Sequence, residues 1–325
     1  MSSIAGTEGK KPLDRQEDTA ILPNAPEYLV IEQDFDVIPS ICHLSAEPNF
    51  KNVICFVKSL GTFEPVAGMV EKISAKPVFS VRGNGKLSDK IKDALNSSSG
   101  CIILCDMYSD RPATLKGKSI DLTIHLGWVD SLPTYRSQIK NSSSTALLLR
   151  REIQPPNGLE LLASLGRAGV SPVNTLTKRR YNRQTDDSIL APGRRQWEGF
   201  VSSSTSAQAI RQAYTSWITH HCQGRHKEPG WTAVDLATHA NRYFRGLFRC
   251  GNDGGALQDR PTVSQGFVKH LGLEAAVAGG LLTVAPTSVP VSPPVANPSN
   301  YHYWRGPPNE GAGMRPAWPT PYPFY

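Results

Sequence analysis

Residues 52–58 read Asn-Val-Ile-Cys-Phe-Val-Lys, and residues 101–106 read Cys-Ile-Ile-Leu-Cys-Asp. Short, nearly continuous apolar runs of this kind are typical of strands that are buried on both faces of a parallel sheet. Four more runs before residue 150 have the composition of strands: Tyr28–Ile31, Val78–Val81, Ile120–Leu126 and Ala146–Leu149. Helical patterns separate the runs. This alternation predicts an α/β lobe, with helices on both faces of a parallel sheet, over residues 26–150.

The helical patterns are apolar stripes that recur every three or four residues. Two stripes have this spacing, one at Leu87, Ile91 and Leu95 and the other at Val66, Met69, Val70 and Ile73. One strand differs from the others, because Asp121, Thr123 and His125 alternate with its apolar residues. We therefore expect the strand at 120–126 to have a solvated face or to lie near the edge of the sheet.

The chain changes character after residue 150. Residues 151–285 hold 16 Lys and Arg against 10 Asp and Glu, so they carry six of the seven surplus positive charges. Their apolar residues fall at helical spacings, and we expect a basic helical domain without strands. Residues 286–325 contain 11 prolines and seven aromatic residues. Such a segment cannot bury enough surface to offset its ordering entropy, so this tail and residues 1–25 are predicted to be disordered.

The sequence predicts a soluble, intracellular protein that does not contact a membrane. No run approaches the roughly 18 apolar residues that a spanning helix needs. The first residues lack the apolar segment of a signal peptide, and they include the acids Glu8, Asp14, Glu17 and Asp18, which mitochondrial leaders avoid. The six cysteines contain no CxxC pair, and we expect them to be reduced. Cys101 and Cys105 should face one side of a buried strand as small hydrophobic groups.

Two short motifs invite a functional interpretation that their geometry does not support. Gly117-Lys118-Ser119 resembles the end of a phosphate loop, but Pro112 stands where that loop needs a glycine. The tripeptide is interpreted as a turn. His220, His221, Cys222 and His226 carry atoms that zinc prefers, yet neighbouring residues on a helix point about 100° apart and cannot converge. We predict neither a metal site nor a catalytic residue.

The densest basic feature consists of six residues within eighteen positions, namely Lys178, Arg179, Arg180, Arg183, Arg194 and Arg195. A solvated helix face or a nuclear address explains such a run as readily as contact with nucleic-acid phosphates does. Tyr181 and Trp197 lie in the same stretch and are candidates for stacking on unpaired bases. We therefore predict RNA contacts at these six basic residues.

Several stretches resemble the second RecA-like lobe of DEAD-box RNA helicases. Residues 52–58 resemble the strand that opens this lobe, and Val81-Arg82-Gly83-Asn84 resembles a turn that grips RNA phosphates. Residues 101–106 resemble the strand that ends in the family's Thr/Ser-Asp pair, and 120–135 resembles the segment before its arginine-finger motif. The resemblance implies a single RecA-like lobe. It also places Arg82 and Lys90 at positions that hold the RNA backbone.

The following segment resembles the helical extension of the DEAD-box helicases of fungal and plant organelles. The matching residues are Ala213-Tyr214-Thr215-Ser216-Trp217, Trp231, Ala240-Asn241-Arg242-Tyr243, Pro261 and Leu271-Gly272-Leu273. In that subfamily the extension follows the second lobe directly and lengthens its RNA-binding face. The resemblance implies RNA as a partner and a mitochondrial location, although the residues themselves leave a nuclear or cytoplasmic location equally open.

The sequence departs from the family at the positions that handle ATP. After Asp106 the family continues Ala-Arg-Gly-(apolar)-Asp, whereas residues 109–114 here read Ser-Asp-Arg-Pro-Ala-Thr, so the acid near the ATP ribose is missing. Where the family has His-Arg-x-Gly-Arg, residues 137–141 read Ser-Gln-Ile-Lys-Asn. Gln138 and Asn141 thus replace both arginines. The degenerate nucleotide-site positions are Asp106, Arg111, Gln138 and Asn141.

These departures predict that the chain has no ATPase activity. An arginine finger accelerates phosphoryl transfer by about a thousandfold or more. The sequence also contains neither a Walker A loop nor an Asp-Glu-Ala-Asp motif, both of which belong to the family's first lobe. We expect no cofactor, with ATP and magnesium entering only if another chain supplies that lobe.

Three hypotheses for the function follow. The first is an RNA-binding protein that is derived from a helicase and has no ATPase activity. The second is a truncated or split helicase that still works. The third is a protein-interaction module whose proline-rich tail, for example Pro290-Val291-Ser292-Pro293, docks a partner of the SH3 or WW type.

Overall fold

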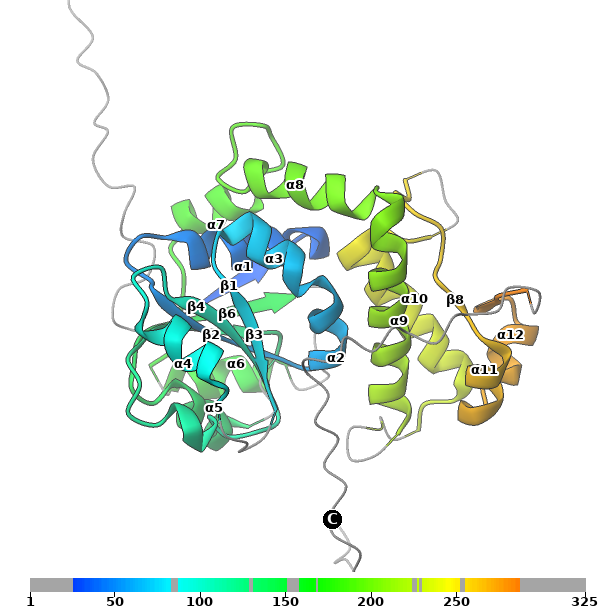
Figure 1. The fold of residues 1–325 in the computed structure, drawn as a ribbon, viewed down its shortest axis with the longest axis horizontal. Helices are drawn as coiled ribbons and strands as arrows, with labels where there is room; N and C mark the ends of the chain where they lie inside the picture. Colours follow the sequence, from blue (N-terminus) through cyan, green and yellow to red (C-terminus); the bar gives the residue numbers. More distant parts are fainter. Residues whose placement is uncertain are drawn as a thin grey trace, which may run out of the picture. The chain divides into compact units, whose positions relative to one another are not determined.

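The computed structural model describes residues 26–82, 87–128, 131–150, 158–167, 169–223, 227, 230–251 and 255–286. Within these ranges the chain forms one compact α/β unit with additional helices (Figure 1). The predicted disorder of residues 1–25 and of the tail beyond residue 286 lies outside the described residues and stays a prediction.

The centre of the fold is a sheet of seven parallel strands in the order β3-β4-β2-β5-β6-β1-β7. The strands are β1 (Glu27–Ile31), β2 (Asn52–Val57), β3 (Val78–Val81), β4 (Cys101–Asp106), β5 (Ile120–Leu126), β6 (Ser142–Arg150) and β7 (Ser171–Pro172). All six strands predicted from the sequence are present. The predicted α/β lobe with a parallel sheet is therefore confirmed.

The helices follow the sequence stripes closely. They are α1 (Val37–Ala46), α2 (Leu60–Phe63), α3 (Ala67–Ser74), α4 (Asp89–Asn96), α5 (Leu132–Ile139), α6 (Gly158–Arg167), α7 (Thr175–Asn182), α8 (Ala191–Val201), α9 (Ala207–Cys222), α10 (Ala233–Phe248), α11 (Gln265–Leu271) and α12 (Glu274–Ala278). Short 3-10 turns are η1 (Asp34–Asp36), η2 (Glu64–Val66), η3 (Ala113–Leu115) and η5 (Ser204–Ser206). After α4, Gly100 has a φ of +66°, and a Cβ there would lie 2.0 Å from the Lys51 carbonyl oxygen, so only glycine fits.

The strand side chains alternate between two cores. Val53, Cys55 and Val57 of β2 face the core that also holds α1, α2 and α3, whereas Ile54 and Phe56 face the opposite side. On that opposite side, α4 packs over β2, β3 and β4, while α5 and α6 pack over β6. Both faces of the sheet are thus covered, as continuous apolar strands require.

The prediction for β5 was wrong. This strand lies between β2 and β6 in the middle of the sheet, and six of its seven residues are buried. Two of its polar side chains make hydrogen bonds within the fold. Asp121 accepts the backbone N–H groups of Lys51 and Asn52 at 3.0 and 2.7 Å, and the Thr123 hydroxyl lies 2.5 Å from that of Ser142. Polar alternation in this strand therefore marks a buried hydrogen-bonded row.

The extension shares its core with the lobe. Trp197 of α8, Tyr214 of α9 and Phe244 of α10 belong to the same buried cluster as Ile38 of α1 and Val53 of β2. Residues 158–286 are mostly helical, as predicted. The expectation that they lack strands was wrong, because β7 extends the sheet beside β1, and β8 (Thr262–Val263) pairs with β9 (Thr283–Val284). In the described part of the chain, no helix combines the length and apolar character needed to cross a membrane.

Two buried carboxylates in η1 join the lobe to the extension. Asp34 receives both ends of the Arg150 guanidinium at the end of β6, with Nε to Oδ1 at 2.8 Å, and the two side chains are 2% and 6% exposed. Asp36 receives Arg194 of α8, with Nη2 to Oδ2 at 2.8 Å. The Arg150 guanidinium also lies over the Tyr243 ring of α10 at 4.4 Å. The turn at η1 therefore holds β6, α8 and α10 in place.

Replacing Asp34 by asparagine should destabilise the protein by about 3 to 5 kcal/mol. The substitution leaves the Arg150 cation buried without its counter-charge, and this imbalance is the main cost of breaking a buried pair. The measurement is chemical denaturation of the full chain. Glu64→Gln is the matched control, because Glu64 pairs with an Arg82 side chain that is 67% exposed. The control should cost less than about 1 kcal/mol. Equal costs for the two variants would contradict the assigned role of η1.

Candidate nucleic-acid interface

Three of the six predicted RNA contacts lie on α7, which packs beside β1 at one edge of the sheet. The helix begins where the Asn174 side chain accepts the Thr177 N–H at 2.8 Å. Lys178 and Arg179 are exposed and Arg180 is half-buried. Three consecutive helical residues point about 100° apart, so this run spreads its charge around α7 rather than along one line.

Three of the basic residues have carboxylate partners on the surface. Lys178 Nζ lies 3.8 Å from Glu32 Oε1, and Arg183 Nη1 lies 2.6 Å from Asp187 Oδ2. Arg195 Nη1 lies 3.9 Å from an oxygen of the exposed Asp186. Exposed pairs contribute at most about 1 kcal/mol, so an incoming phosphate can compete for these cations. These three carboxylates nevertheless reduce the net positive charge of the surface around the basic residues below the value expected from the basic residues alone.

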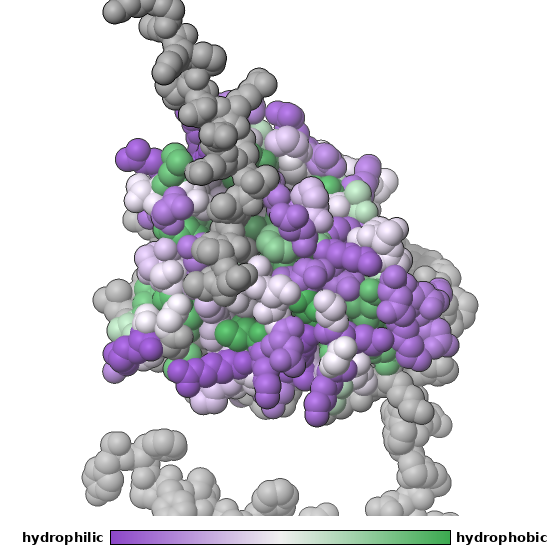
Figure 2. Space-filling view, turned by 90° about the vertical axis from the view of Figure 1, so that its left-hand side faces the viewer, coloured by the Kyte–Doolittle hydropathy of each residue, from purple (hydrophilic) through white to green (hydrophobic). Residues whose placement is uncertain are grey.

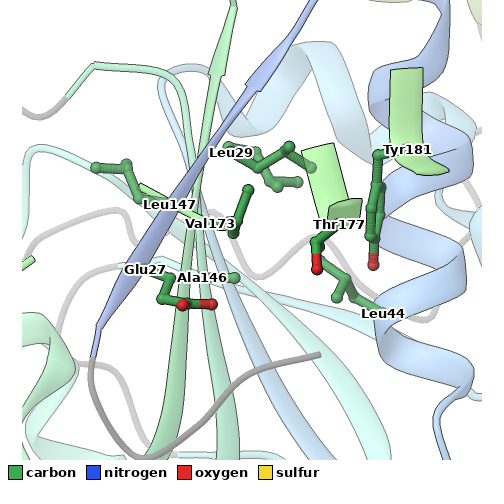
Figure 3. Close-up of a pocket in the computed structure, with 9 residues that line it drawn as sticks. Glu27, Leu29, Leu44, Ala146, Leu147, Val173, Thr177 and Tyr181 are labelled. Carbon is green, nitrogen blue, oxygen red and sulfur yellow. The ribbon is translucent and has the colours of Figure 1, made fainter. Parts of the chain in front are cut away.

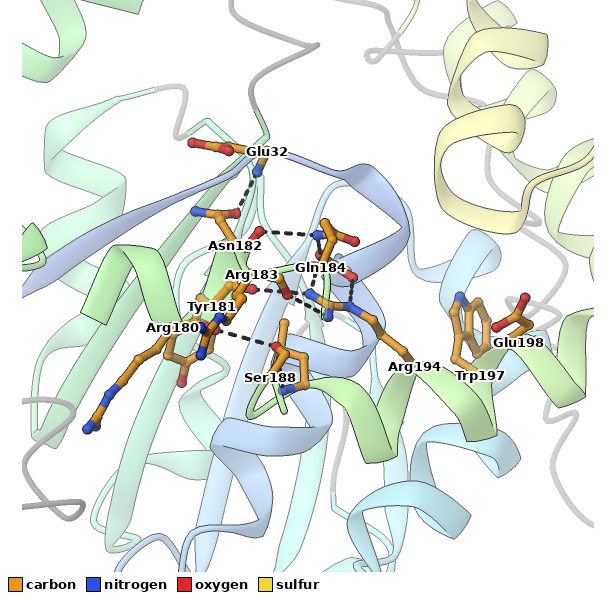
Figure 4. Close-up of polar contacts among 12 residues, drawn as sticks. Glu32, Arg180, Tyr181, Asn182, Arg183, Gln184, Ser188, Arg194, Trp197 and Glu198 are labelled. Carbon is orange, nitrogen blue, oxygen red and sulfur yellow. Dashed lines mark hydrogen bonds and ion pairs between the residues drawn. The ribbon is translucent and has the colours of Figure 1, made fainter. Parts of the chain in front are cut away.

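Arg194 is placed differently from the other basic residues, with a side chain that is only 12% exposed. Besides its two bonds to Asp36, it donates to the Arg183 carbonyl at 2.7 Å and to the Tyr181 carbonyl at 3.3 Å (Figure 4). The Gln184 amide reaches the same carboxylate at 2.8 Å. Arg194 therefore fixes the connection between α7 and α8 onto η1, and its donors point into the fold.

The two aromatic residues of this stretch cannot stack on bases, and that prediction was wrong. Tyr181 is 1% exposed and packs edge-on against His43 at 5.7 Å. Trp197 is fully buried, and its Nε1–H donates to the Leu247 carbonyl at 3.2 Å. Both rings form part of the main core. Apolar burial, rather than a nucleic acid, accounts for aromatic residues within this basic stretch.

Arg82 and Lys90 lie at the other edge of the sheet. Arg82 follows β3 and pairs with Glu64, with Nε to Oε1 at 3.1 Å, and Lys90 is exposed on α4. The edge strand β3 and the α7 neighbour β1 are separated by five strand spacings, or about 24 Å. The structure thus does not bring Arg82 and Lys90 together with the basic residues of α7. Gly83 and Asn84 of the same predicted turn lie outside the described residues.

Gln138 is built into the fold at the position where the family has an arginine. Its Nε2 donates to the Met107 and Ser109 carbonyls at 2.7 and 2.6 Å, and its Oε1 lies 2.8 Å from His125 Nε2. The residue is 1% exposed. A neutral amide, with two donors and an acceptor, matches these three partners. Gln138 therefore ties α5 to β5 and to the loop after β4.

The other three nucleotide-site positions have local structural contacts. Asp106 Oδ1 accepts the Tyr108 N–H at 2.9 Å. The Arg111 side chain donates to the Lys140 carbonyl, and burial lowers the pKa of this guanidinium. Asn141 has a φ of +64°, a left-handed conformation that asparagine tolerates better than most residues do. The predicted turn at 117–119 is also present, with Gly117 at a φ of +76°.

One small pocket and the arrangement of metal-binding side chains bear on whether the described residues could hold a ligand or a metal. A pocket beside β1 is lined by Leu29, Leu44, Val173, Thr177 and Tyr181, among others (Figure 3). Its cavity volume of about 10 Å³ suffices for about one water molecule. Within the described ranges, no three histidine, cysteine or acidic side chains gather in a way that could hold a metal ion. The side of the lobe farthest from α11 and α12 is mainly hydrophilic, with small hydrophobic areas (Figure 2).

Solved structures with a similar fold include DEAD-box proteins and domains of DEAD-box proteins. Domain 2 of the helicase Mss116p, solved on an RNA duplex, is 13% identical with a TM-score of 0.41, covering 80% of this chain and 98% of that one. The E. coli protein SrmB, solved with the regulator RraA, is 14% identical with a TM-score of 0.36 (50% and 96% covered). The C-terminal domain of Dbp5 is 12% identical with a TM-score of 0.35 (46% and 90% covered).

No protein-family model and no curated protein sequence matches this chain. Identities of 12 to 14% leave few side chains in common with the solved structures.

The pH dependence of stability should identify His125 as a buried neutral group. Burial lowers its pKa from the ordinary 6.5 to about 4, although its bond to Gln138 opposes this shift. Below pH 6.5 the unfolded chain takes up a proton that the folded protein refuses, so stability falls as the pH drops toward 4. Between pH 7 and 5 this loss should be about 2 kcal/mol.

Urea titrations at pH 7 and pH 5 measure this loss of stability. The variant His125→Phe should remove most of the difference between the two pH values, and it should be less stable than the unaltered chain at both. His43→Phe is the comparison. Burial also lowers the pKa of His43, but Glu47 opposes the shift at 3.5 Å, so this variant should remove less of the acid sensitivity. Full acid sensitivity in His125→Phe would contradict the assignment.

Proposed function

We propose that this chain binds RNA through exposed basic residues of α7, of the α7–α8 connection and of α8, and that it does not hydrolyse ATP. The observation that carries the proposal is the exposure of Lys178, Arg179, Arg183 and Arg195, of which three are held only by surface carboxylates. Phosphate contacts need mobile, solvent-facing cations of this kind. The resemblance of the sequence to a helicase lobe with a basic extension supports RNA as the polyanion.

The contacts of Gln138 support the second part of the proposal. An arginine acting on a transferring phosphate needs a positive charge whose donors point at the phosphate, whereas Gln138 is neutral, buried and bonded to three partners within the fold. This arrangement disfavours the alternative of a helicase half that still works. The tail that would dock a protein partner lies outside the described residues, so that alternative receives no support here.

Replacing Lys178, Arg179 and Arg183 by glutamine should weaken binding of single-stranded RNA and flatten its salt dependence. Each phosphate contact contributes about 0.7 to the slope of log affinity against log salt, so three lost contacts reduce the slope by about 2. The measurement is a salt titration of the full chain with labelled oligonucleotides of different sequence. All sequences should weaken alike, because phosphate contacts carry no base information.

The matched control replaces three exposed lysines of the lobe by glutamine and so makes the same change in net charge. These lysines are Lys72, Lys92 and Lys116. It should leave the salt slope close to that of the unaltered chain. If both triple variants change the slope equally, RNA is attracted by net charge alone and the α7 assignment is wrong.

The purified chain should release no phosphate from ATP above the buffer background, with or without RNA. Gln138→Arg should not create activity. It should also lower the stability by about 2 kcal/mol or more, because it places a cation without a counter-charge at a buried position and removes the oxygen that lies 2.8 Å from His125 Nε2. Phosphate release and thermal unfolding measure the two effects. RNA-stimulated release by the unaltered chain would overturn the proposal.

A further inference from the structure

The small pocket beside β1 lies where the chain enters the sheet. Its lining is almost entirely apolar and includes Glu27, the first residue of β1, Leu44 of α1 and Thr177 of α7 (Figure 3). The Pro26 carbonyl, just before β1, accepts the Ser171 N–H of β7 at 3.1 Å. The chain therefore reaches β1 at the rim of this pocket, which is called the β1 pocket below.

An exposed apolar side chain adjoins the β1 pocket. Leu176 directly precedes Thr177 on α7 and is 63% exposed, the largest value for a large hydrophobic residue in the described ranges. The β1 pocket itself holds about one water-sized group, which is also the size of the methyl end of an aliphatic side chain. An apolar segment lying across the β1 pocket and Leu176 would remove both from water.

The sequence directly before β1 contains such a segment together with a turn. Ile21-Leu22 is an adjacent pair of large apolar residues. Leu22-Pro23-Asn24-Ala25 has proline and asparagine at the two central positions that β-turns favour for them. A β-turn brings its first residue to within about 7 Å of its fourth. Leu22 would then lie beside Ala25, two residues before Glu27, at the rim of the β1 pocket.

The residues that precede the apolar pair are acidic. Residues 14–18 contain Asp14, Glu17 and Asp18 against the single base Arg15. Asp18 is three residues before Ile21, so it stays within about 11 Å of that residue even in a fully extended chain. Any surface that binds Ile21-Leu22 therefore also meets this negative charge.

The α7 helix carries matching positive charge next to the β1 pocket. Lys178 and Arg179 follow Thr177 directly, and both are exposed. Lys178 lies 3.8 Å from Glu32, whereas Arg179 has no ion-pair partner in the part of the chain that the structure describes. A second copy of the chain, with its net charge of +7, fits this surface less well than an acidic segment does.

We propose that residues 14–22, the strap, dock beside α7 and compete with RNA for its cations. Ile21 and Leu22 cover the β1 pocket and Leu176, and the three acids of the strap lie against Lys178 and Arg179. The predicted disorder of the N-terminal segment then applies to residues 1–13. The competition rests on the proposed function, whereas the docking of the strap does not.

The strap needs little intrinsic affinity because it is tethered to its site. Five residues join Leu22 to Glu27, and a short flexible tether gives a local concentration on the order of millimolar. RNA binds α7 only in the fraction of molecules whose strap is released, so the apparent affinity for RNA falls in proportion to that fraction.

Disulfide cross-linking in the full chain tests the docking without RNA. Leu22→Cys with Thr177→Cys should form a disulfide within one chain under a mild oxidant, because this bond needs Cα atoms within about 7 Å. The control combines Leu22→Cys with Ala163→Cys, an exposed position on α6, which covers the opposite face of the sheet, and should form little disulfide. Peptide mass spectrometry assigns each disulfide, because the six native cysteines are free thiols.

The RNA affinity of the full chain tests the competition. Ile21→Ser with Leu22→Ser should strengthen binding of single-stranded RNA at least about threefold, because it raises the fraction of molecules whose strap is released. Ile4→Ser with Leu13→Ser is the matched control in the same terminal segment, and it should leave the affinity unchanged.

Neutralising the three strap acids should strengthen RNA binding more than neutralising three exposed acids elsewhere, although both changes raise the net charge by three. The strap changes are Asp14→Asn, Glu17→Gln and Asp18→Asn. The control changes are Asp93→Asn, Glu160→Gln and Glu274→Gln. The advantage of the strap changes should vanish in the chain that already carries Ile21→Ser and Leu22→Ser, because its strap no longer docks.

The outcomes separate the strap from the proposed function. If the unaltered chain binds RNA but both cysteine pairs cross-link equally, or the serine variant binds no more tightly, the strap is overturned and the proposed function stands. Disulfides between two chains would overturn the strap and make a second copy the occupant of the β1 pocket. If the chain binds no RNA, the competition fails together with the proposed function, and cross-linking decides the docking.

Discussion

Two carboxylates, two residues apart in η1, constrain the rest of the structure. Asp34 and Asp36 are almost completely buried, and an ion buried in this way is tolerated only when a counter-charge and hydrogen bonds replace its water. Arg150 and Arg194 supply both, one from the last strand of the lobe and one from the extension. Gly246 of α10 leaves room for Asp34, because a Cβ there would lie 2.7 Å from the carboxylate oxygen. These buried charges therefore tie the lobe to the extension.

This constraint changes how the basic stretch is interpreted. From the sequence, Arg194 looks like one more phosphate contact, but its partner Asp36 lies 158 positions away in the chain and cannot be inferred from local pattern. Tyr181 and Trp197 are buried for the same reason, since α7 and α8 cover the sheet and α1. The charge left for a ligand is that of the side chains on the outer surfaces of these helices. Charge counted along a sequence therefore overstates charge presented to a ligand.

How well each element could be predicted depends on how far apart in the sequence its interacting residues lie. Strands and helices of the lobe could be predicted because apolar spacing along the chain reports directly which face is buried. The position of β5 could not, because His125 and Asp121 appear polar until Gln138 and the backbone of β2 satisfy them. The sequence shows only that position 138 carries a neutral amide. Gln138 also holds the loop after β4, through backbone carbonyls about 30 positions earlier in the chain. Nothing in the sequence indicates that these carbonyls lie beside Gln138.

The surface proposed for RNA depends on the same turn. Arg194 of α8 joins the Tyr181 carbonyl at the end of α7 to Asp36 of η1. α10 is held to the same turn through Tyr243, Arg150 and Asp34. The buried charges of η1, which never meet a ligand, thereby fix the position of α7, whose exposed cations are proposed to contact RNA.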